Sequence, residues 1–173
     1  GRAAHGKIRK GFGLVARAFL KAFPDEADVR LNYKLHGDCE VDRIEDPRII
    51  YTCEYFDWPK LVEWYRGNTA YVSGSSGEGW GLHLMQSMAV GCCPIAARYG
   101  GQAEFFDADV GRAVDFKPVR ASEVWASMGS WAELSESSLI DQMRWVYENK
   151  SAAIKLGRKA ATRASLYTWE RTV

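Results

Sequence analysis

Short apolar runs alternate with amphipathic stretches along the chain, and no other feature constrains the fold as strongly. Strands are predicted at residues 29–35, 49–53, 69–73, 93–97 and 110–116. Helices are predicted at residues 12–23, 57–65, 82–90, from 135 or 137 to 149, and 151–166. Because strands separated by helices pair in parallel, we expect an α/β fold. It would be a single Rossmann-like domain over residues 1–173, with an open parallel sheet and helices on both faces.

The bulk composition excludes several classes of protein. A chain of 173 residues with 47% hydrophobic and 26% charged residues fits one globular domain rather than a disordered segment. A net charge of +1 gives no electrostatic reason to bind nucleic acid. The sequence contains no run of about 18 apolar residues and no signal peptide. We therefore expect a cytoplasmic protein without a transmembrane segment.

The cysteines and histidines are not spaced as metal ligands. They are Cys39, Cys53, Cys92, Cys93, His5, His36 and His83. None of the cysteines forms a Cys-x-x-Cys pair, and the histidines do not cluster with them. We therefore expect no metal, and we expect the adjacent Cys92 and Cys93 to be buried thiols in a reducing compartment.

A basic run near the end of the chain leaves two interpretations open. Lys155, Arg158, Lys159 and Arg163 recur at helical spacing. Such a run is most often a solvated helix face, and contact with lipid head groups is the alternative. A peripheral position at the inner membrane face is compatible with the second interpretation.

The glycine-rich segment 74–81 is the strongest candidate for a binding loop. It holds four glycines and two serines in eight residues, between a predicted strand and a predicted helix. In open parallel sheets, ligands bind beyond the carboxyl ends of the strands. Glycines allow close approach of the backbone, and a helix start favours phosphate. The segment matches neither a P-loop nor a Gly-x-Gly-x-x-Gly fingerprint, so a plain turn is the alternative.

Two polar residues flank the start of the predicted helix. Glu78 lies in the loop and Gln86 follows eight positions later, about two helical turns on, so both can meet one ligand. Without a ligand, an acid near a helix start is still favourable by about 0.3–1 kcal/mol. Gln86 is equally compatible with a solvent-facing helix position.

Three motifs resemble the signature of glycosyltransferase family 4. They are Ser76-x-Glu78-Gly-Trp80-Gly-Leu82, the segment Gln86-Ser-Met88-Ala-x-Gly91 with Pro94 shortly after it, and Gly100-Gly101-x-x-Glu104. The Gly1-Arg2 and Lys10-Gly11 pairs and the run Tyr167-Thr-Trp-Glu170 are also similar to that family. The resemblance implies the donor-binding, C-terminal half of a retaining enzyme with the two-domain GT-B architecture, in which residues 167–173 cross back to the other domain.

The resemblance also implies roles for individual residues. Arg2 and Lys10 hold the diphosphate of a nucleotide-sugar donor, and Glu78 contacts the transferred sugar as the third catalytic residue. The remaining donor-binding residues are Gly79, Trp80, Gly81, Leu82, His83, Gln86, Cys53, Glu54, Gly100, Gly101 and Glu104. No cofactor or metal is implied, because the cations and the helix start neutralise the diphosphate. The acceptor, a glycan, lipid or other hydroxyl compound, is expected on an N-terminal domain outside this sequence.

Gln86 departs from the family pattern, which has a second glutamate at this position. An amide can still hydrogen-bond ribose hydroxyls, but charged hydrogen bonds are about twice as strong. The first hypothesis is therefore sugar transfer with retention. The alternative is a non-catalytic nucleotide-sugar-binding module or a degenerate partner subunit. A sugar-nucleotide epimerase is a third possibility, which the segment 76–91 disfavours.

Overall fold

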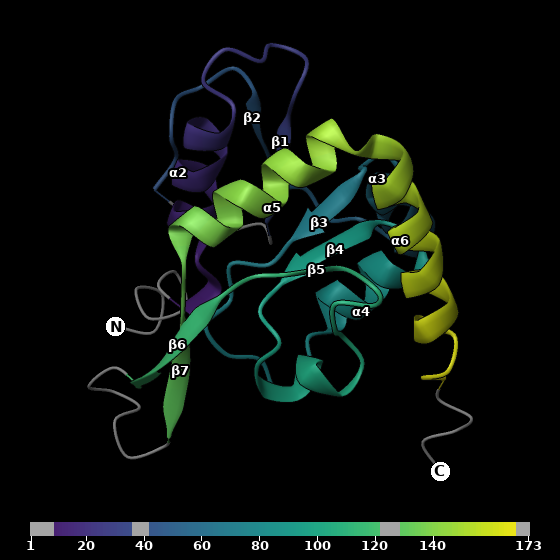
Figure 1. Ribbon diagram of the computed structural model, residues 1–173. Coiled ribbons are helices and arrows are strands. Elements are labelled where there is room, and N and C mark those ends of the chain that lie inside the picture. The colour runs from purple at the N-terminus through teal and green to yellow at the C-terminus, as the bar shows by residue number, and fades with distance from the viewer. Residues whose placement is uncertain (1–8, 36–41, 122–128, 169–173) are drawn as a thin grey trace.

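The computed structural model describes residues 9–35, 42–121 and 129–168 (Figure 1). Helices and strands alternate, as predicted. The helices are α2 (Phe12–Ala22), α3 (Trp58–Arg66), α4 (Leu82–Ala89), the 3-10 helix η1 (Gly100–Glu104), α5 (Glu136–Glu148) and α6 (Lys150–Ala164). The strands are β1 (Leu31–Lys34), β2 (Ile49–Thr52), β3 (Ala70–Val72), β4 (Cys93–Ala96), β5 (Arg112–Ala113), β6 (Phe116–Arg120) and β7 (Ser130–Leu134).

The first five strands are all paired in parallel, which confirms the predicted fold class. They are divided between a two-stranded sheet, β1-β2, and a three-stranded sheet in the order β3-β4-β5. A side-chain hydrogen bond of 2.7 Å from Asn32 of β1 to Asn68, just before β3, links the two sheets. The carboxyl ends of the paired strands therefore point the same way within each sheet.

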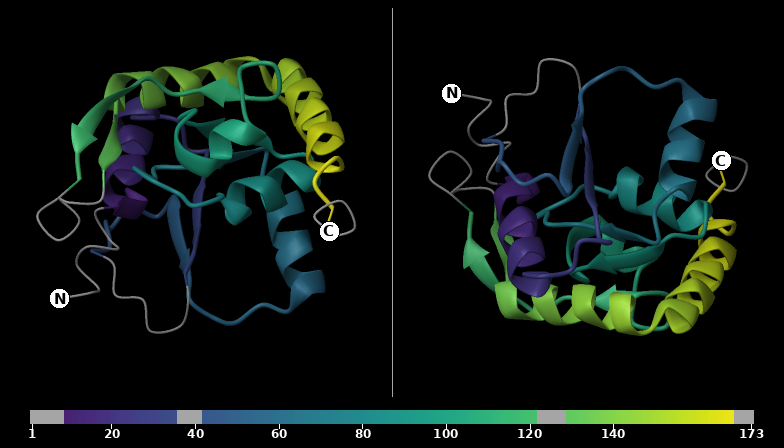
Figure 2. Two further views of the ribbon diagram at one scale, coloured as in Figure 1. Left: turned by 90° about the horizontal axis from the view of Figure 1, so that it is seen from below. Right: turned by 90° about the horizontal axis from the view of Figure 1, so that it is seen from above.

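Helices cover both faces of β4. Cys93, Ile95 and Ala97 are buried in one hydrophobic cluster, which includes residues of α2 and α5. Ala96 points to the opposite face and belongs to a second cluster, with residues of α4 and α6. This is the period of two expected of a strand buried on both sides. Figure 2 shows α5 and α6 following one another around the outside of the sheets.

Capping residues explain where several helices begin. The side chain of Asp57 accepts a hydrogen bond of 3.0 Å from the Lys60 amide and begins α3, as predicted. Ser135, rather than Ser137, caps α5. The prediction that Ser151 starts the last helix is wrong, because α6 already begins at Lys150, with Asn149 as its first cap.

An antiparallel hairpin of β6 and β7 is the main element that the sequence did not predict. We expected one strand over residues 110–116, but β5 has two residues and a separate strand begins at Phe116. The hairpin reaches the glycine-rich segment, where the Ala132 amide donates a hydrogen bond of 2.8 Å to the Ser76 carbonyl. The final segment predicted after Thr168 lies outside the described residues.

Helices α4 and α6 approach each other through two glycines. A Cβ atom on Gly157 would lie 2.0 Å from the carbonyl oxygen of Gly91, so no larger residue fits without separating the two backbones. Gly91 itself has a φ of +88°, which favours glycine there. The second hydrophobic cluster depends on this approach, because Leu84 of α4 and Ala160 of α6 both lie in it.

Gly157→Ala tests this contact. The intrinsic helix propensity favours alanine by about 1 kcal/mol, but we expect the overlap with Gly91 to lower the free energy of unfolding by about 1–3 kcal/mol. Chemical denaturation measures the change. Gly13→Ala in α2 is the matched control, because its Cβ would meet only Arg17 Nη1 at 3.4 Å. Equal stability of the two variants would contradict the prediction.

Candidate functional site

The glycine-rich loop 74–81 connects β3 to α4 and is held by the chain segment just before α2. The Ser76 amide donates a hydrogen bond of 2.8 Å to the Arg9 carbonyl. The Arg9 guanidinium in turn donates one of 2.6 Å to the Gly77 carbonyl. A Cβ on Gly11 would lie 2.0 Å from the Gly74 carbonyl oxygen. Two segments more than 60 residues apart in sequence are thus in direct backbone contact.

Lys10 and Glu78 meet at the centre of this contact. Lys10 Nζ lies 2.5 Å from Glu78 Oε1, and Arg9 Nη1 lies 3.9 Å from Glu78 Oε2. Both partners of the Lys10–Glu78 pair are partly shielded from solvent. The structure therefore brings together two of the three residues predicted to be catalytic. The third, Arg2, lies outside the described residues.

The environment of Glu78 keeps its side chain ionised. Partial burial acts to raise the pKa of the carboxyl, but the hydrogen bonds from Lys10 and Ser75 and the charges of Lys10 and Arg9 act the other way. The net effect lowers the pKa of Glu78 below its ordinary value. Arg9 and Ser75 were missed by the sequence analysis, because neither belongs to the recognised motifs.

Gly100 and Gly101 support the loop from the opposite side. The Gly101 amide donates a hydrogen bond of 3.0 Å to the Glu78 carbonyl. A Cβ on Gly101 would lie 1.8 Å from the Gly79 carbonyl oxygen, and Gly100 has a φ of +68°. Both predicted donor-binding glycines therefore have an observable structural role, which is to let η1 pack on the backbone of the loop.

Helix α4 starts directly after the loop, without a side-chain cap. Gly81 precedes it with a φ of +91°, and its carbonyl accepts the first helical hydrogen bond from Met85, at 3.0 Å. The side chains of Leu82 and His83 are exposed, as is that of Trp80 at the end of the loop. A helix start without a side-chain cap suits a phosphate group.

Gln102 was not singled out in the sequence, but it packs beneath this helix start. Its side chain is buried, and its amide donates a hydrogen bond to the Ala97 carbonyl at the end of β4. A Cβ on Gly81 would lie 3.2 Å from Gln102 Cβ. Gln102 thus fixes the distance between the end of β4 and the start of α4. Its position inside the Gly-Gly-x-x-Glu motif was the available signal.

Gln86 is half-buried and does not simply face solvent. The Tyr65 hydroxyl of α3 donates a long hydrogen bond of 3.5 Å to Gln86 Oε1. Burial raises the pKa of Tyr65 to about 12. The Tyr65 ring lies 6.1 Å from that of Tyr71. The charge of Glu78 adds to the effect of burial in raising the pKa of Tyr71. Gln86 therefore contacts the buried Tyr65, which in turn contacts the half-buried Tyr71.

Three other predicted residues contact different neighbours. Cys53, just after β2, accepts a hydrogen bond of 3.2 Å from Arg43, and Glu54 forms an ion pair of 3.0 Å with Lys60. The Glu104 side chain is exposed, and its carbonyl accepts a hydrogen bond of 3.0 Å from the Tyr167 hydroxyl.

Trp80 belongs to an aromatic group. Its ring lies 5.3 Å from that of Phe105 and 5.8 Å from that of Tyr167. The Tyr167 ring also lies 6.0 Å from that of Phe105. This group joins the end of the glycine-rich loop to η1 and to the segment after α6.

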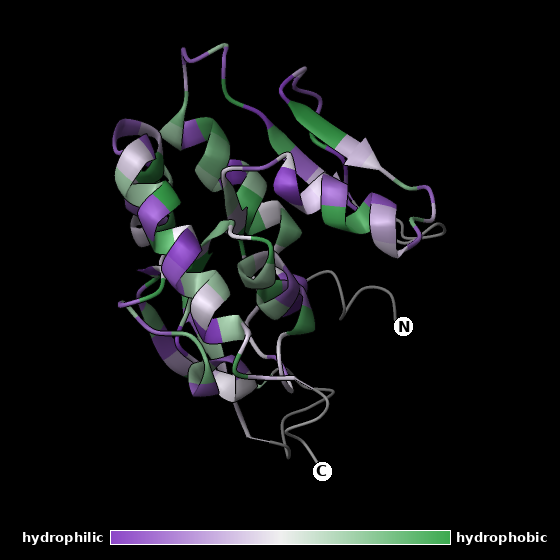
Figure 3. Cartoon of the chain, turned by 90° about the vertical axis from the view of Figure 1, so that its right-hand side faces the viewer, coloured by the Kyte–Doolittle hydropathy of each residue, from purple (hydrophilic) through white to green (hydrophobic). Residues whose placement is uncertain are grey.

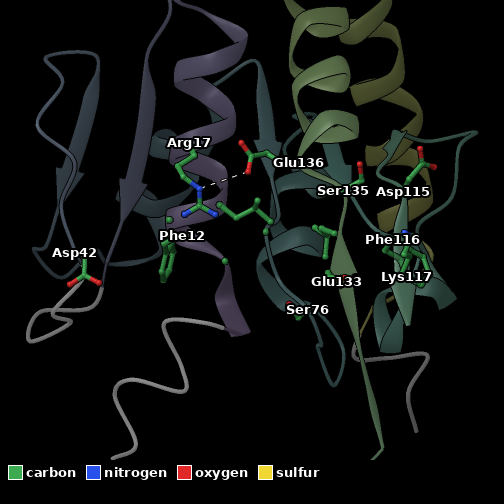
Figure 4. A pocket seen from close by; sticks show the side chains of 15 residues that line it. Phe12, Arg17, Asp42, Ser76, Asp115, Phe116, Lys117, Glu133, Ser135 and Glu136 are labelled. Carbon is green, nitrogen blue, oxygen red and sulfur yellow. Dashed lines mark ion pairs between the residues drawn. The ribbon is translucent and has the colours of Figure 1, made fainter. Parts of the chain in front are cut away.

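A groove of about 860 Å³ opens beside the loop (Figure 4). Its lining includes Gly11, Gly74 and Ser76 from the contact described above. The opposite wall comes from the β6–β7 hairpin and the start of α5. Figure 4 shows Arg17 of α2 pointing toward Glu136 of α5, at an Nε–Oε2 distance of 3.8 Å. The groove was not predicted, because part of its wall belongs to the unpredicted hairpin.

The adjacent thiols of Cys92 and Cys93 are both buried. Burial raises the pKa of both the Cys92 and the Cys93 thiol to about 11, which agrees with the expectation of buried thiols. Among the described residues, no three His, Cys, Asp or Glu side chains gather in a way that would hold a metal ion. None of the helices in the same ranges is long and apolar enough to cross a membrane.

Several solved structures resemble this chain along most of its length. A GtfA/B complex covers 94% of this chain with a TM-score of 0.71 and 19% identity, and the chain covers 31% of it. Sucrose-phosphate synthase from Thermosynechococcus elongatus has a TM-score of 0.67 and 19% identity. The match covers 94% of this chain and 39% of the synthase chain. At these identities the likeness shows the fold, which is GT-B-like.

The sequence comparison is more specific. Residues 50–160 match the family described as glycosyl transferases group 1, and the chain belongs to that family. D-inositol 3-phosphate glycosyltransferase of Arthrobacter sp. (strain FB24) is 28% identical over 115 residues, which are 66% of this chain and 23% of the relative. The protein of the same name from Pseudarthrobacter chlorophenolicus is 27% identical over 140 residues, which are 80% of this chain and 28% of the relative. The chain thus spans about a quarter of the length of the curated relatives it matches.

Replacing Glu78 by glutamine tests its interaction with Lys10. Because the pKa of Glu78 is lowered in the folded protein, its carboxylate stabilises the fold above its ordinary pKa of 4.5, and this contribution is lost as the pH falls through the folded-state value. We expect Glu78→Gln to lower the free energy of unfolding by about 1–2 kcal/mol at pH 7. The difference from wild type should shrink below pH 4.5.

Denaturant titrations at several pH values measure this difference. Glu63→Gln, at an exposed position of α3, is the control, and its free energy of unfolding should stay close to that of wild type at every pH. A deficit of Glu78→Gln that stays constant from pH 7 down to pH 3 would contradict an ionic interaction.

Proposed function

We propose that this chain is the donor-binding part of a retaining, metal-independent glycosyltransferase that takes a nucleotide-diphosphate sugar. The observation that carries the proposal is the Lys10–Glu78 contact of 2.5 Å beside the uncapped start of α4. It combines a cation for a diphosphate, an acid for sugar hydroxyls and free amides for phosphate oxygens. Membership of the glycosyl transferases group 1 family supports the same reaction class.

In the proposed reaction, one bond at the anomeric carbon breaks and another forms. The bond from this carbon to the diphosphate oxygen breaks, and the acceptor oxygen bonds to the carbon on the same face. The proton of the acceptor hydroxyl passes to the departing diphosphate oxygen, so no protein base is needed. Lys10 stabilises the negative charge that builds on that oxygen. Its ammonium has three donors and can contact the diphosphate while keeping its bond to Glu78.

The other proposed donor contacts use the residues that the sequence analysis singled out. The amides of Gly81, Leu82 and His83 face the phosphates at the start of α4. Glu78 accepts hydrogen bonds from the transferred sugar, and Gln86 contacts the ribose. Arg2 supplies a second cation, while Gly100, Gly101 and Glu104 frame the sugar side of the loop.

The rest of the donor and the acceptor complete the proposal. Cys53 and Glu54 lie on the nucleobase side, at the end of β2. Trp80, exposed beside Gly79, borders the sugar. The acceptor is a hydroxyl compound bound mainly by a part of the protein outside this chain, because the chain spans only about a quarter of its curated relatives.

Lys10→Ala tests the role of the cation. In the intact protein, with uridine-, guanosine- and adenosine-diphosphate glucose supplied in turn, we expect kcat/KM for the accepted donor to fall by about 100-fold, as when one preorganised donor is removed. Lys10→Arg should retain part of the activity. Arg30→Ala, at an exposed position, is the control.

Calorimetry on the same proteins separates binding from chemistry. The wild type should bind at least one of uridine, guanosine and adenosine diphosphate, and Lys10→Ala should bind it more weakly. The proposal fails if none of the three binds at millimolar concentration, or if Lys10→Ala turns over the donor as fast as wild type.

A non-catalytic nucleotide-sugar-binding module is the second candidate, because Gln86 stands where the family pattern has an acid. We expect Gln86→Glu to bind the nucleotide about fivefold more tightly, since a hydrogen bond to a charged group contributes about 1 kcal/mol more than a neutral one. Calorimetry measures the affinity and a donor-turnover assay the rate. Gln142→Glu on α5 is the matched control.

The turnover of the two proteins decides between the candidates. Wild-type transfer in the ordinary range for enzymes, about 1–1000 per second, excludes the non-catalytic module. A wild type without turnover together with a large gain in Gln86→Glu identifies a decayed site.

A further inference from the structure

Helix α6 is strongly basic, whereas the rest of the chain is acidic. Its fifteen residues contain five Lys or Arg side chains and no Asp or Glu. The whole chain has a net charge of only +1, so the residues outside α6 together carry −4. A single helix of +5 on an otherwise acidic chain creates a strongly polarised surface.

The cations of α6 lie on its outer face. The inner face is buried through Ala153, Gly157, Ala160 and Ala164. Opposite these residues, Lys155, Arg158 and Lys159 are exposed. Helix α6 lies on the right in Figure 1, and Figure 3 shows that side of the molecule facing the viewer.

Within the part of the chain that the structure describes, most of these cations have no acidic partner. Arg163 forms an ion pair of 3.1 Å with Asp107. Within residues 9–35, 42–121 and 129–168, Lys155, Arg158 and Lys159 form no ion pair with an acid. Their charge is therefore available to an external anion.

Exposed apolar side chains accompany the cations. Ile154, one turn before Arg158, is 49% exposed, and Leu166, just beyond the helix, is 50% exposed. A helix with cations and exposed aliphatic residues on one face is suited to a lipid interface, where the cations meet phosphate groups and the aliphatic side chains enter the acyl boundary. Contact with nucleic acid would use the cations but not the aliphatic residues.

The carboxyl end of α6 leads to the candidate site. Tyr167, three residues after the helix, donates its hydrogen bond to the Glu104 carbonyl and packs against Trp80. A membrane in contact with α6 would therefore lie near the loop that precedes α4. This proximity matters for any acceptor that is held at a membrane surface.

We propose that the outer face of α6 docks the protein on a membrane that contains anionic phospholipids. The contact is electrostatic, with Lys155, Arg158 and Lys159 against lipid phosphates, and Ile154 and Leu166 insert between them. The proposal concerns an interaction surface and does not depend on the chemistry proposed for Lys10 and Glu78.

Vesicle binding of the intact protein tests the proposal. Vesicles of phosphatidylcholine with 30% phosphatidylglycerol, about a typical anionic content, are compared with phosphatidylcholine alone at low salt. Each cation near an anionic membrane raises the affinity about fivefold. We expect the double variant Lys155→Gln/Arg158→Gln to bind the anionic vesicles about 25-fold more weakly, and Ile154→Ser to bind them more weakly at equal charge.

Arg30→Gln/Lys117→Gln is the matched control, with the same loss of charge at exposed positions before β1 and on β6. It should bind as the wild type does. The proposal is overturned if the wild type does not prefer anionic vesicles, or if both double variants lose the same affinity. It is also overturned if Lys155→Gln/Arg158→Gln weakens binding to a 20-nucleotide RNA but not to vesicles.

Discussion

Direct contact between glycine backbones is the constraint on which the rest of this structure depends. Gly11 meets Gly74 on one side of the loop before α4, and Gly101 meets Gly79 on the other, at separations that leave no room for a Cβ atom. The loop is therefore clamped between the start of α2 and η1. Because both clamps are made of backbone, the position of Glu78 is set by main-chain geometry rather than by a flexible side chain.

The sequence predicted those parts of the fold in which local signals and tertiary packing agree. Helix α3 begins at the predicted cap, Asp57, and β4 is buried on both faces, as its apolar run indicated. The β6–β7 hairpin could not be predicted, because Pro118 and the charged residues around it carry no clear strand pattern. It forms because its residues pair with each other and reach Ser76, which is a long-range contact.

The motif residues of the candidate site could be predicted from the sequence, but the residues that pack against them could not. The resemblance assigned Lys10, Glu78 and the start of α4 to one site, and the structure joins the first two directly. The contact of Tyr65 with Gln86, and the packing of Gln102 beneath Gly81, were not visible in the sequence. Such residues act through burial and packing, which a linear motif does not encode. Arg9 was hidden for a related reason, since its role comes from a carbonyl 68 residues away.

The junction between α5 and α6 has a mechanical consequence. Asn149 is at once the last cap of α5 and the first cap of α6, so no flexible residue separates the two helices. The direction of α6 is therefore tied to that of α5. The far end of α5, at Glu136, pairs with Arg17 and Lys21 of α2, the helix that follows Gly11 and its contact with the loop that holds Glu78.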